Sequence, residues 1–218
     1  IKTAYVEHRT HYTDSFGDHE LRAAICALYK KEYGVIVTPD RVLVTSGSSP
    51  ALLLALEVLC DAGDNVLVSN PGYPCYRDFA LACHAVPKDV PVSATNGFQL
   101  DPADVVKATD DRTRAVFVNS PMNPAGTLAS DDALKTLAAG PVTVLSDEIY
   151  HGLVYNGRRP RSILEFTDDA FVFNGFSKRF AMTGLRLGYL IAPKKYLRAL
   201  RILQQNLFIC AGSTAQRA

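Results

Sequence analysis

Short apolar runs rich in β-branched residues alternate along the chain with segments whose apolar residues recur every three to four positions. The first pattern is typical of buried strands and the second of helices that bury one face. Their alternation predicts an α/β fold of three layers, with a mostly parallel sheet between two layers of helices. We expect strands at residues 41–45, 65–69, 114–119, 142–147, 170–174 and 187–192, and helices at 19–33, 51–60, 101–109, 131–139 and 193–207.

The composition fits one large globular domain. Hydrophobic residues make up 48% of the 218 residues, and 23 Lys and Arg are balanced by 22 Asp and Glu. This composition excludes a disordered chain, and it offers no basic excess for a nucleic-acid partner. No apolar run approaches the ~20 residues that cross a membrane. The five cysteines are odd in number and fit no metal-ligand spacing, so we expect free, buried thiols, no metal site and a reducing, cytoplasmic location.

A serine-rich turn leads from the 41–45 strand into the next helix. Ser48 and Ser49 precede Pro50, which fits a first helical turn because its missing N–H is not needed there. The free amides and the positive end of the helix at this point suit a phosphate group. Serine is also a common helix cap, so the turn alone leaves both interpretations open.

A lysine and an arginine follow the 170–174 strand. Lys178 comes just after this apolar run, where burial favours the neutral amine that a Schiff base requires. Arg186, eight residues further on, could grip a phosphate with two hydrogen bonds. Together they fit a cofactor with an aldehyde at one end and a phosphate at the other. Without further support, such a pair is more typical of ordinary surface charges.

Three further residues lie at or just after the carboxyl ends of expected strands. Asp147 ends an apolar strand, a poor place for an anion unless it faces a cation such as a protonated pyridine nitrogen. Asn123 follows the 114–119 strand in an Asn-Pro turn, and Tyr73 offers a flat ring after the 65–69 strand. Ligand sites of α/β folds lie beyond the carboxyl ends of strands, so these residues are expected to meet.

The order of these motifs, over nearly the whole chain, resembles the fold type I pyridoxal-phosphate enzymes, and specifically the class I and II aminotransferases. The resemblance implies the large domain of that fold, a pyridoxal 5′-phosphate cofactor, and transfer of an amino group from an amino acid to a 2-oxo acid. It implies that Lys178 forms the Schiff base and moves the substrate proton. Asp147 would keep the pyridine nitrogen protonated, and Tyr73 would stack on the ring.

The same resemblance assigns the remaining cofactor contacts. Asn123 and Tyr150 would hydrogen-bond the phenolic oxygen of the cofactor. Tyr12 would reach the phosphate of a neighbouring subunit, which implies a homodimer with shared sites. The residues expected to hold the phosphate are Ser48, Ser49 and Arg186, with either Ser177 or the backbone compensating for Gly175, where many relatives have serine.

The arginine that binds the substrate carboxylate in this family belongs to a C-terminal small domain and matches nothing in this chain. We therefore expect residues 1–218 to be the cofactor-binding large domain of a longer protein, without the small domain and the N-terminal segment. Two alternatives remain open. One is a carbon–sulfur β-lyase on the same scaffold, and the other is the aminotransferase-like effector domain of a transcriptional regulator.

Overall fold

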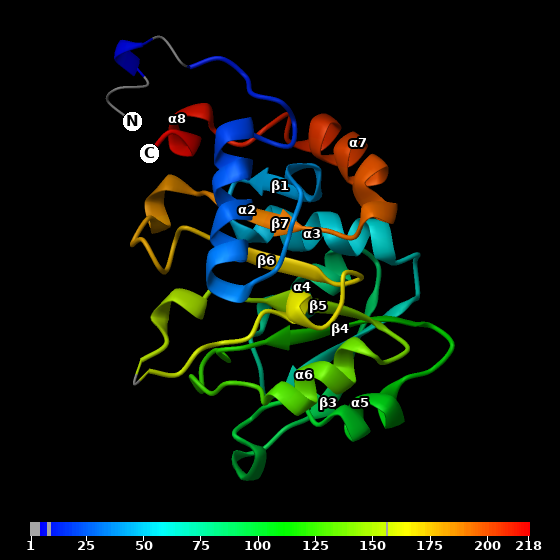
Figure 1. Cartoon of the computed structure of the whole chain (residues 1–218). Helices are drawn as coiled ribbons and strands as arrows, with labels where there is room; N and C mark the ends of the chain where they lie inside the picture. The colour runs from blue at the N-terminus through cyan, green and yellow to red at the C-terminus, as the bar shows by residue number, and fades with distance from the viewer. Residues whose placement is uncertain (1–4, 8–9, 156) are drawn as a thin grey trace.

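A seven-stranded sheet forms the centre of the computed structural model, which describes residues 5–7, 10–155 and 157–218 (Figure 1). The strand order is β1-β7-β6-β5-β4-β2-β3. Strand β7 is antiparallel to both of its neighbours, and the other pairs are parallel, so the predicted mostly parallel sheet is confirmed. The strands are β1 (Val42–Thr45), β2 (Asn65–Asn70), β3 (Val86–Pro91), β4 (Thr113–Asn119), β5 (Thr143–Asp147), β6 (Phe171–Gly175) and β7 (Gly188–Ile191).

Helices cover both faces of the sheet, which gives the three expected layers (Figure 1). Helices α2, α5 and α6 pack on one face, and α3, α4 and α7 pack on the other. The α-helices are α2 (His19–Tyr33), α3 (Ser48–Leu59), α4 (Cys75–Ala82), α5 (Pro102–Ala108), α6 (Asp131–Ala138), α7 (Leu197–Leu207) and α8 (Ser213–Gln216). The short 3₁₀ helices are η1 (Pro39–Arg41), η2 (Ala94–Asn96), η3 (His151–Leu153), η4 (Ile163–Glu165), η5 (Thr183–Leu185) and η6 (Lys194–Tyr196).

The sheet separates two apolar cores. In β4, Val116 and Val118 pack in the core beneath α2, α5 and α6, whereas Ala115 and Phe117 pack in the core beneath α3, α4 and α7. Successive side chains of a strand point to opposite faces, so a strand that is buried on both faces has an unbroken apolar sequence. This is why the sequence of the central strands predicts them well.

Two helices begin three or more residues away from their predicted starts, and the other predicted helix ends agree to within one residue. Helix α3 begins at Ser48, before the expected start, because Pro50 occupies its first turn and interrupts no hydrogen bond there. Helix α7 begins only at Leu197, because the 3₁₀ helix η6 takes up the preceding residues. Helix α2 agrees with the prediction at both ends, since Asp18 caps its start and Gly34 adopts the left-handed conformation beyond its end.

Helix α4 and strand β3 were not predicted. Strand β3 is the edge of the sheet, and its sequence, Val-Pro-Lys-Asp-Val-Pro, is mostly exposed or half-buried. Proline and charge are typical of edge strands, where unpaired backbone groups face solvent, but they hide the apolar alternation that predicts a strand.

The cysteines are free, as expected, but only Cys83 is buried; Cys26, Cys60, Cys75 and Cys210 are half-buried. The expectation that all five are buried is therefore wrong. In the part of the chain that the structure describes, no helix has the length and apolar character needed to cross a membrane.

Candidate active site

The carboxyl ends of four strands and the start of α3 meet around a cavity of about 230 Å³. All the predicted site residues except Tyr12 line this cavity, although they come from segments far apart in the sequence. Its polar and aromatic lining includes Ser48, Ser49, Tyr73, Tyr76, Asn119, Asn123, Asp147, Tyr150, Ser177, Lys178, Thr183 and Arg186.

One end of the cavity is suited to an anion. Ser48 and Ser49 lie in the first turn of α3, where backbone N–H groups have no partner within the helix. The guanidinium of Arg186 donates to the carbonyl of Thr183 at 3.0 Å and lies against Gly47. A Cβ atom at Gly47 would come within 2.7 Å of Nη2 of Arg186. Only glycine lets the arginine approach the helix terminus this closely.

The other end holds a buried carboxylate. Asp147 is 6% exposed; one of its oxygens accepts a hydrogen bond from the hydroxyl of Tyr76 at 2.7 Å, and the other accepts from the amide of Ile149 at 3.2 Å. Burial raises the pKa of Asp147, while these two hydrogen bonds and the charge of Lys178 act in the opposite direction. Among the described residues, Asp147 has no cationic side chain within ion-pairing distance. Its position is therefore suited to a cationic group of a ligand.

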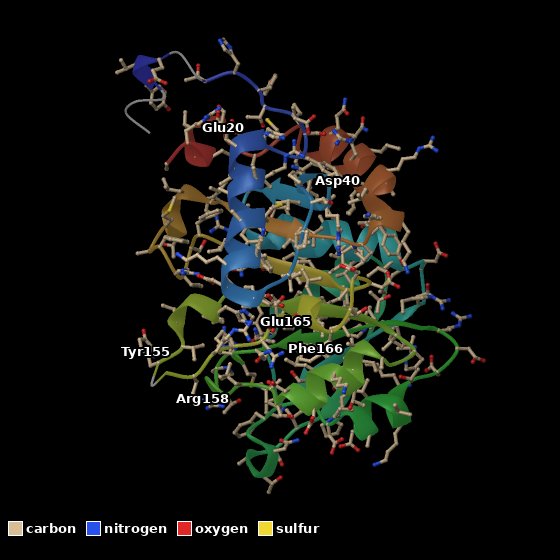
Figure 2. All side chains as sticks on the ribbon, viewed as in Figure 1. Glu20, Asp40, Tyr155, Arg158, Glu165 and Phe166 are labelled. Atoms are coloured by element: carbon tan, nitrogen blue, oxygen red, sulfur yellow. The ribbon has the colours of Figure 1, made fainter. Side chains whose placement is uncertain are left out.

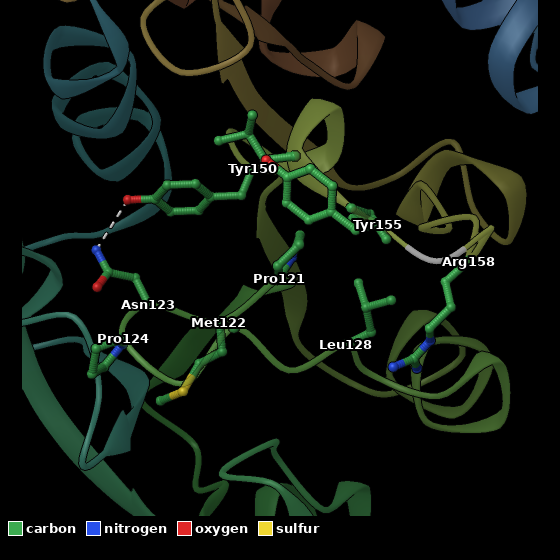
Figure 3. Close-up of a pocket in the computed structure, with 11 residues that line it drawn as sticks. Pro121, Met122, Asn123, Pro124, Leu128, Tyr150, Tyr155 and Arg158 are labelled. Atoms are coloured by element: carbon green, nitrogen blue, oxygen red, sulfur yellow. Dashed lines mark hydrogen bonds between the residues drawn. The ribbon is translucent and has the colours of Figure 1, made fainter.

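Asn123 and Tyr150 also meet at this cavity. The side-chain amide of Asn123 donates to the hydroxyl of Tyr150 at 3.1 Å (Figure 3). The same two residues also form one wall of a second pocket of about 410 Å³, lined further by Met122, Leu128 and Tyr155 among others. Space for a ligand therefore continues beyond the Asn123–Tyr150 pair.

Comparison with known proteins decides the family. A family model described as aminotransferase class I and II matches residues 5–218. The chain is 42% identical, over 95% of its length, to a valine–pyruvate aminotransferase of Mycobacterium tuberculosis. It is 40% identical, over 97% of its length, to a (5-formylfuran-3-yl)methyl phosphate transaminase of Methanocaldococcus jannaschii. The chain belongs to the class I and II aminotransferase family.

Solved structures of aminotransferases have the same fold. A mutant of the Thermus thermophilus aspartate aminotransferase superposes with a TM-score of 0.94 at 33% identity, covering 99% of this chain and 57% of that one. An aromatic aminotransferase of Pyrococcus horikoshii also gives 0.94, at 31% identity. The chain spans 54% and 56% of the length of the two curated relatives named above. The predicted fold type I architecture is confirmed.

Aminotransferases of this family generally depend on pyridoxal phosphate, and the cavity fits that group. The cradle at Gly47 offers backbone amides and a guanidinium to a phosphate. At the other end, the buried carboxylate of Asp147 matches a protonated ring nitrogen. The half-buried ring of Tyr73 and the hydroxyl of Tyr150 line the space between.

Lys178 differs from the prediction in one respect. Its side chain is exposed, so the expected burial of the amine is wrong: β6 ends at Gly175, and the chain that follows emerges from the core. The ammonium of Lys178 lies 5.9 Å from the centre of the Tyr150 ring, at the cavity. A Cβ atom at Gly175 would lie 2.9 Å from Cα of Gly188, which explains why serine is not accommodated there.

Tyr12 lies outside the cavity, with 79% of its surface exposed. Its predicted role in a neighbouring subunit requires this outward position.

Tyr76 and Asn119, which both contact Asp147, are among the cavity residues that the sequence analysis missed. Tyr76 stacks on Phe117, with ring centres 4.3 Å apart, and donates to Asp147 from helix α4. Asn119 accepts from the amide of Asn123 at 2.7 Å and donates to the carbonyl of Asp147 at 3.2 Å. The signal for Asn119 was a polar residue ending an apolar strand, as for Asp147. Tyr76 had no comparable signal, because helix α4 was not predicted.

Proposed function

We propose that the full-length protein is a pyridoxal-phosphate-dependent aminotransferase that moves an amino group from an amino acid to a 2-oxo acid. The observation that carries this proposal is the convergence of a phosphate cradle, a buried carboxylate and an exposed lysine on one cavity. The names of the relatives include both a valine–pyruvate enzyme and one with a phosphate-bearing substrate. We therefore propose the two substrates only by class, as an amino acid and a 2-oxo acid.

When bound, pyridoxal phosphate would supply an aldehyde that condenses with amines and a protonated ring that withdraws electrons from the reacting carbon. Lys178 provides the amine for the covalent attachment, and its Nζ atom then moves the proton that leaves the substrate Cα. Its position at the cavity, beside the Tyr150 ring, leaves this amine free to act.

The other residues bind and orient. Asp147 would pair with the ring nitrogen and keep it protonated, and Tyr73 would stack on the ring. Asn123 and Tyr150 share a hydrogen bond and would donate to the phenolic oxygen. The residues that would hold the phosphate are Ser48, Ser49, Ser177 and Arg186, which all line the cavity.

We also propose a homodimer in which Tyr12 contacts the phosphate bound by the neighbouring subunit. Its exposed position supports this role. Residues 1–218 are proposed to be the cofactor-binding domain, with the substrate-binding arginine elsewhere in a longer protein, since the relatives are nearly twice as long. The free cysteines support a cytoplasmic location. Neither the comparisons nor the described residues favour the β-lyase or the regulator.

The test uses the full-length protein with pyridoxal phosphate and a panel of amino acids and 2-oxo acids. The wild type is expected to form a new amino acid from the 2-oxo acid, and borohydride reduction should leave a cofactor adduct on Lys178, detected by mass spectrometry. Lys178→Ala should abolish both. Unchanged turnover in that variant would reject the proposal, as would release of ammonia and pyruvate from cystathionine without an acceptor.

A further inference from the structure

Glu148 directly follows Asp147 and is completely buried. Its Oε1 atom accepts three hydrogen bonds, from Oγ of Ser146 at 3.2 Å, Oγ of Ser162 at 3.0 Å and the amide of Ile163 at 2.9 Å. Burying a carboxyl group costs free energy unless hydrogen bonds replace its hydration. This one side chain has four hydrogen-bond partners, three of them outside the 146–151 segment, although it does not line the cofactor cavity.

The second carboxyl oxygen faces helix α2 and η3. Oε2 accepts from the hydroxyl of Tyr29 at 3.4 Å and lies 3.6 Å from Nδ1 of His151. Tyr33 of α2 shares a hydrogen bond of 2.9 Å with the same ring nitrogen. Glu148 therefore joins the turn after β5 to α2 and to η4.

The main chain of this turn is tied to the neighbouring strand. The amide of Glu148 donates to the carbonyl of Phe173 in β6 at 2.9 Å, and the amide of His151 donates to the carbonyl of Glu148 at 3.0 Å. In β6, the side-chain oxygen of Asn174 accepts from the amide of Gly175 at 2.7 Å. The same buried group thus borders both segments that lead into the cavity, the one with Asp147 and the one with Lys178.

We propose that Glu148 is a positioning residue, whose buried carboxyl fixes the 147–151 turn so that Asp147 and Tyr150 face the cofactor cavity. This inference rests on the proposed function for its consequence in catalysis. Its geometry does not, because the contacts of Glu148 exist in the protein without cofactor. A buried carboxyl that only positions other residues affects catalysis through them. Its loss should therefore change the shape and mobility of the 147–151 turn, and any change in catalysis should follow from that.

The test compares Glu148→Gln with Glu148→Leu in the full-length protein. Glutamine keeps an oxygen that can accept from Ser162 and Ile163, whereas leucine fills the space without any acceptor. Hydrogen exchange of the 147–151 amides is measured without cofactor, and the dissociation constant of pyridoxal phosphate is measured separately. For Glu148→Leu we expect exchange to rise by about tenfold or more and cofactor binding to weaken by about tenfold, corresponding to ~1.4 kcal/mol. Glu148→Gln should keep most of the wild-type protection from exchange and most of the wild-type cofactor affinity.

Glu165 provides a matched control. It lies in η4 (labelled in Figure 2), accepts from Arg159 and Arg161, and caps η4 through the amide of Ser162; among the described residues it has no hydrogen bond or ion pair with the 147–151 turn. Glu165→Leu should therefore destabilise the protein and speed exchange around 159–165, while exchange at 147–151 stays at the wild-type rate. A kcat loss in Glu148→Leu with KM near the wild-type value should accompany the exchange result.

The proposal is overturned if Glu148→Leu lowers only thermal stability and leaves exchange at 147–151 unchanged. It is equally overturned if Glu148→Gln is as damaging as Glu148→Leu. Should Glu148→Leu fail to fold, Ser162→Ala and Tyr29→Phe remove single partners of the carboxyl, and each should speed exchange of the same turn. If the wild type binds no pyridoxal phosphate, the proposed function fails, while the exchange comparison still decides the role of Glu148.

Discussion

Asp147 depends on its neighbours for its charge. Burial raises its pKa, and the hydroxyl of Tyr76 is the strongest influence in the opposite direction. In Tyr76→Phe the pKa of Asp147 should rise further, which weakens its pairing with a cationic ring nitrogen. The ring stacking on Phe117 is retained in this variant. We expect about tenfold weaker binding of pyridoxal phosphate, measured by titration, and a loss of about 1–3 kcal/mol in unfolding free energy.

The control is Tyr196→Phe, which removes the hydroxyl of a half-buried tyrosine that packs against Phe171, outside the cavity. This variant should bind the cofactor like the wild type. Equal cofactor affinity in Tyr76→Phe and wild type would contradict the assigned role of Tyr76.

Glu148 and His151 give stability a defined dependence on pH. Burial raises the pKa of Glu148 to about 8 and lowers the pKa of His151 to about 3. A raised carboxyl pKa favours folding at low pH, and this contribution is lost as pH rises from the ordinary value of 4.5 to about 8. A lowered histidine pKa acts in the opposite sense, because stability is lost as pH falls from 6.5 towards 3.

The two effects cancel between pH 4.5 and 6.5, where the folded state gains one proton on Glu148 and lacks one on His151 relative to the unfolded chain. Between pH 6.5 and about 8 only the carboxyl of this pair contributes, and the unfolding free energy should fall by up to about 1.4 kcal/mol per pH unit. Glu148→Gln should remove this decline and expose the histidine effect, so that its stability rises between pH 4.5 and 6.5. Urea unfolding at half-unit pH steps measures the difference, and parallel curves for the two proteins would refute the assignment.

At the scale of the element, the N-terminus of α3 depends on one glycine. Gly34 has φ 73° and ψ 7°, the left-handed helical region, where alanine should cost about 1–2 kcal/mol of stability. Gly47 has φ 92° and ψ 174°, a region that is essentially restricted to glycine, where alanine should cost about 1–3 kcal/mol. Only at Gly47 would the new Cβ meet Arg186, at 2.7 Å, whereas nothing lies within 4 Å at Gly34. Gly47→Ala should therefore weaken binding of pyridoxal phosphate by about tenfold or more.

Gly34→Ala is the matched control and should keep the wild-type affinity, measured by the same titration after both variants are shown to be folded. Equal loss of affinity in the two variants would mean that backbone strain, and not displacement of Arg186, limits the site.

The elements that the sequence predicts are those whose pattern follows from burial. Strand β4 has apolar side chains on both faces, and α2 has a cap at each end, so both were predicted closely. Strand β3 is exposed at the sheet edge, and α4 follows a proline turn without a capping side chain, so neither carries a local signal. The local pattern of apolar and polar residues predicts elements that are buried in the core. It does not predict elements whose position depends on their neighbours.

At the scale of the whole molecule, the same limit applies to the site. Asn123, Asp147 and Lys178 were predicted from their positions at or after the ends of strands, because a parallel sheet brings the carboxyl ends of its strands to one edge. The contact between Tyr76 and Asp147 joins residues 71 apart in the sequence, and that between Tyr29 and Glu148 joins residues 119 apart. Such partners are set by how helices pack on the sheet, and no spacing along the chain predicts them.

If a dimer shares its active sites, two inactive variants should recover activity when they are mixed in one dimer. Lys178→Ala lacks the reacting amine but keeps Tyr12, and Tyr12→Ala keeps the amine. If Tyr12 serves the neighbouring subunit, a mixed dimer of the two variants contains one site with both residues intact and one with neither. Random exchange of subunits puts half of the molecules in mixed dimers, so activity should recover to about a quarter of the wild-type value.

The measurement is activity of the two full-length variants before and after they are unfolded together and refolded. Each variant refolded alone is the control and should remain at its own low activity. If Tyr12 acted within its own subunit, the mixed dimer would contain no site with both residues intact, and co-refolding would add nothing to the mean of the two variants. The exposed position of Tyr12, outside the cavity of its own chain, favours recovery.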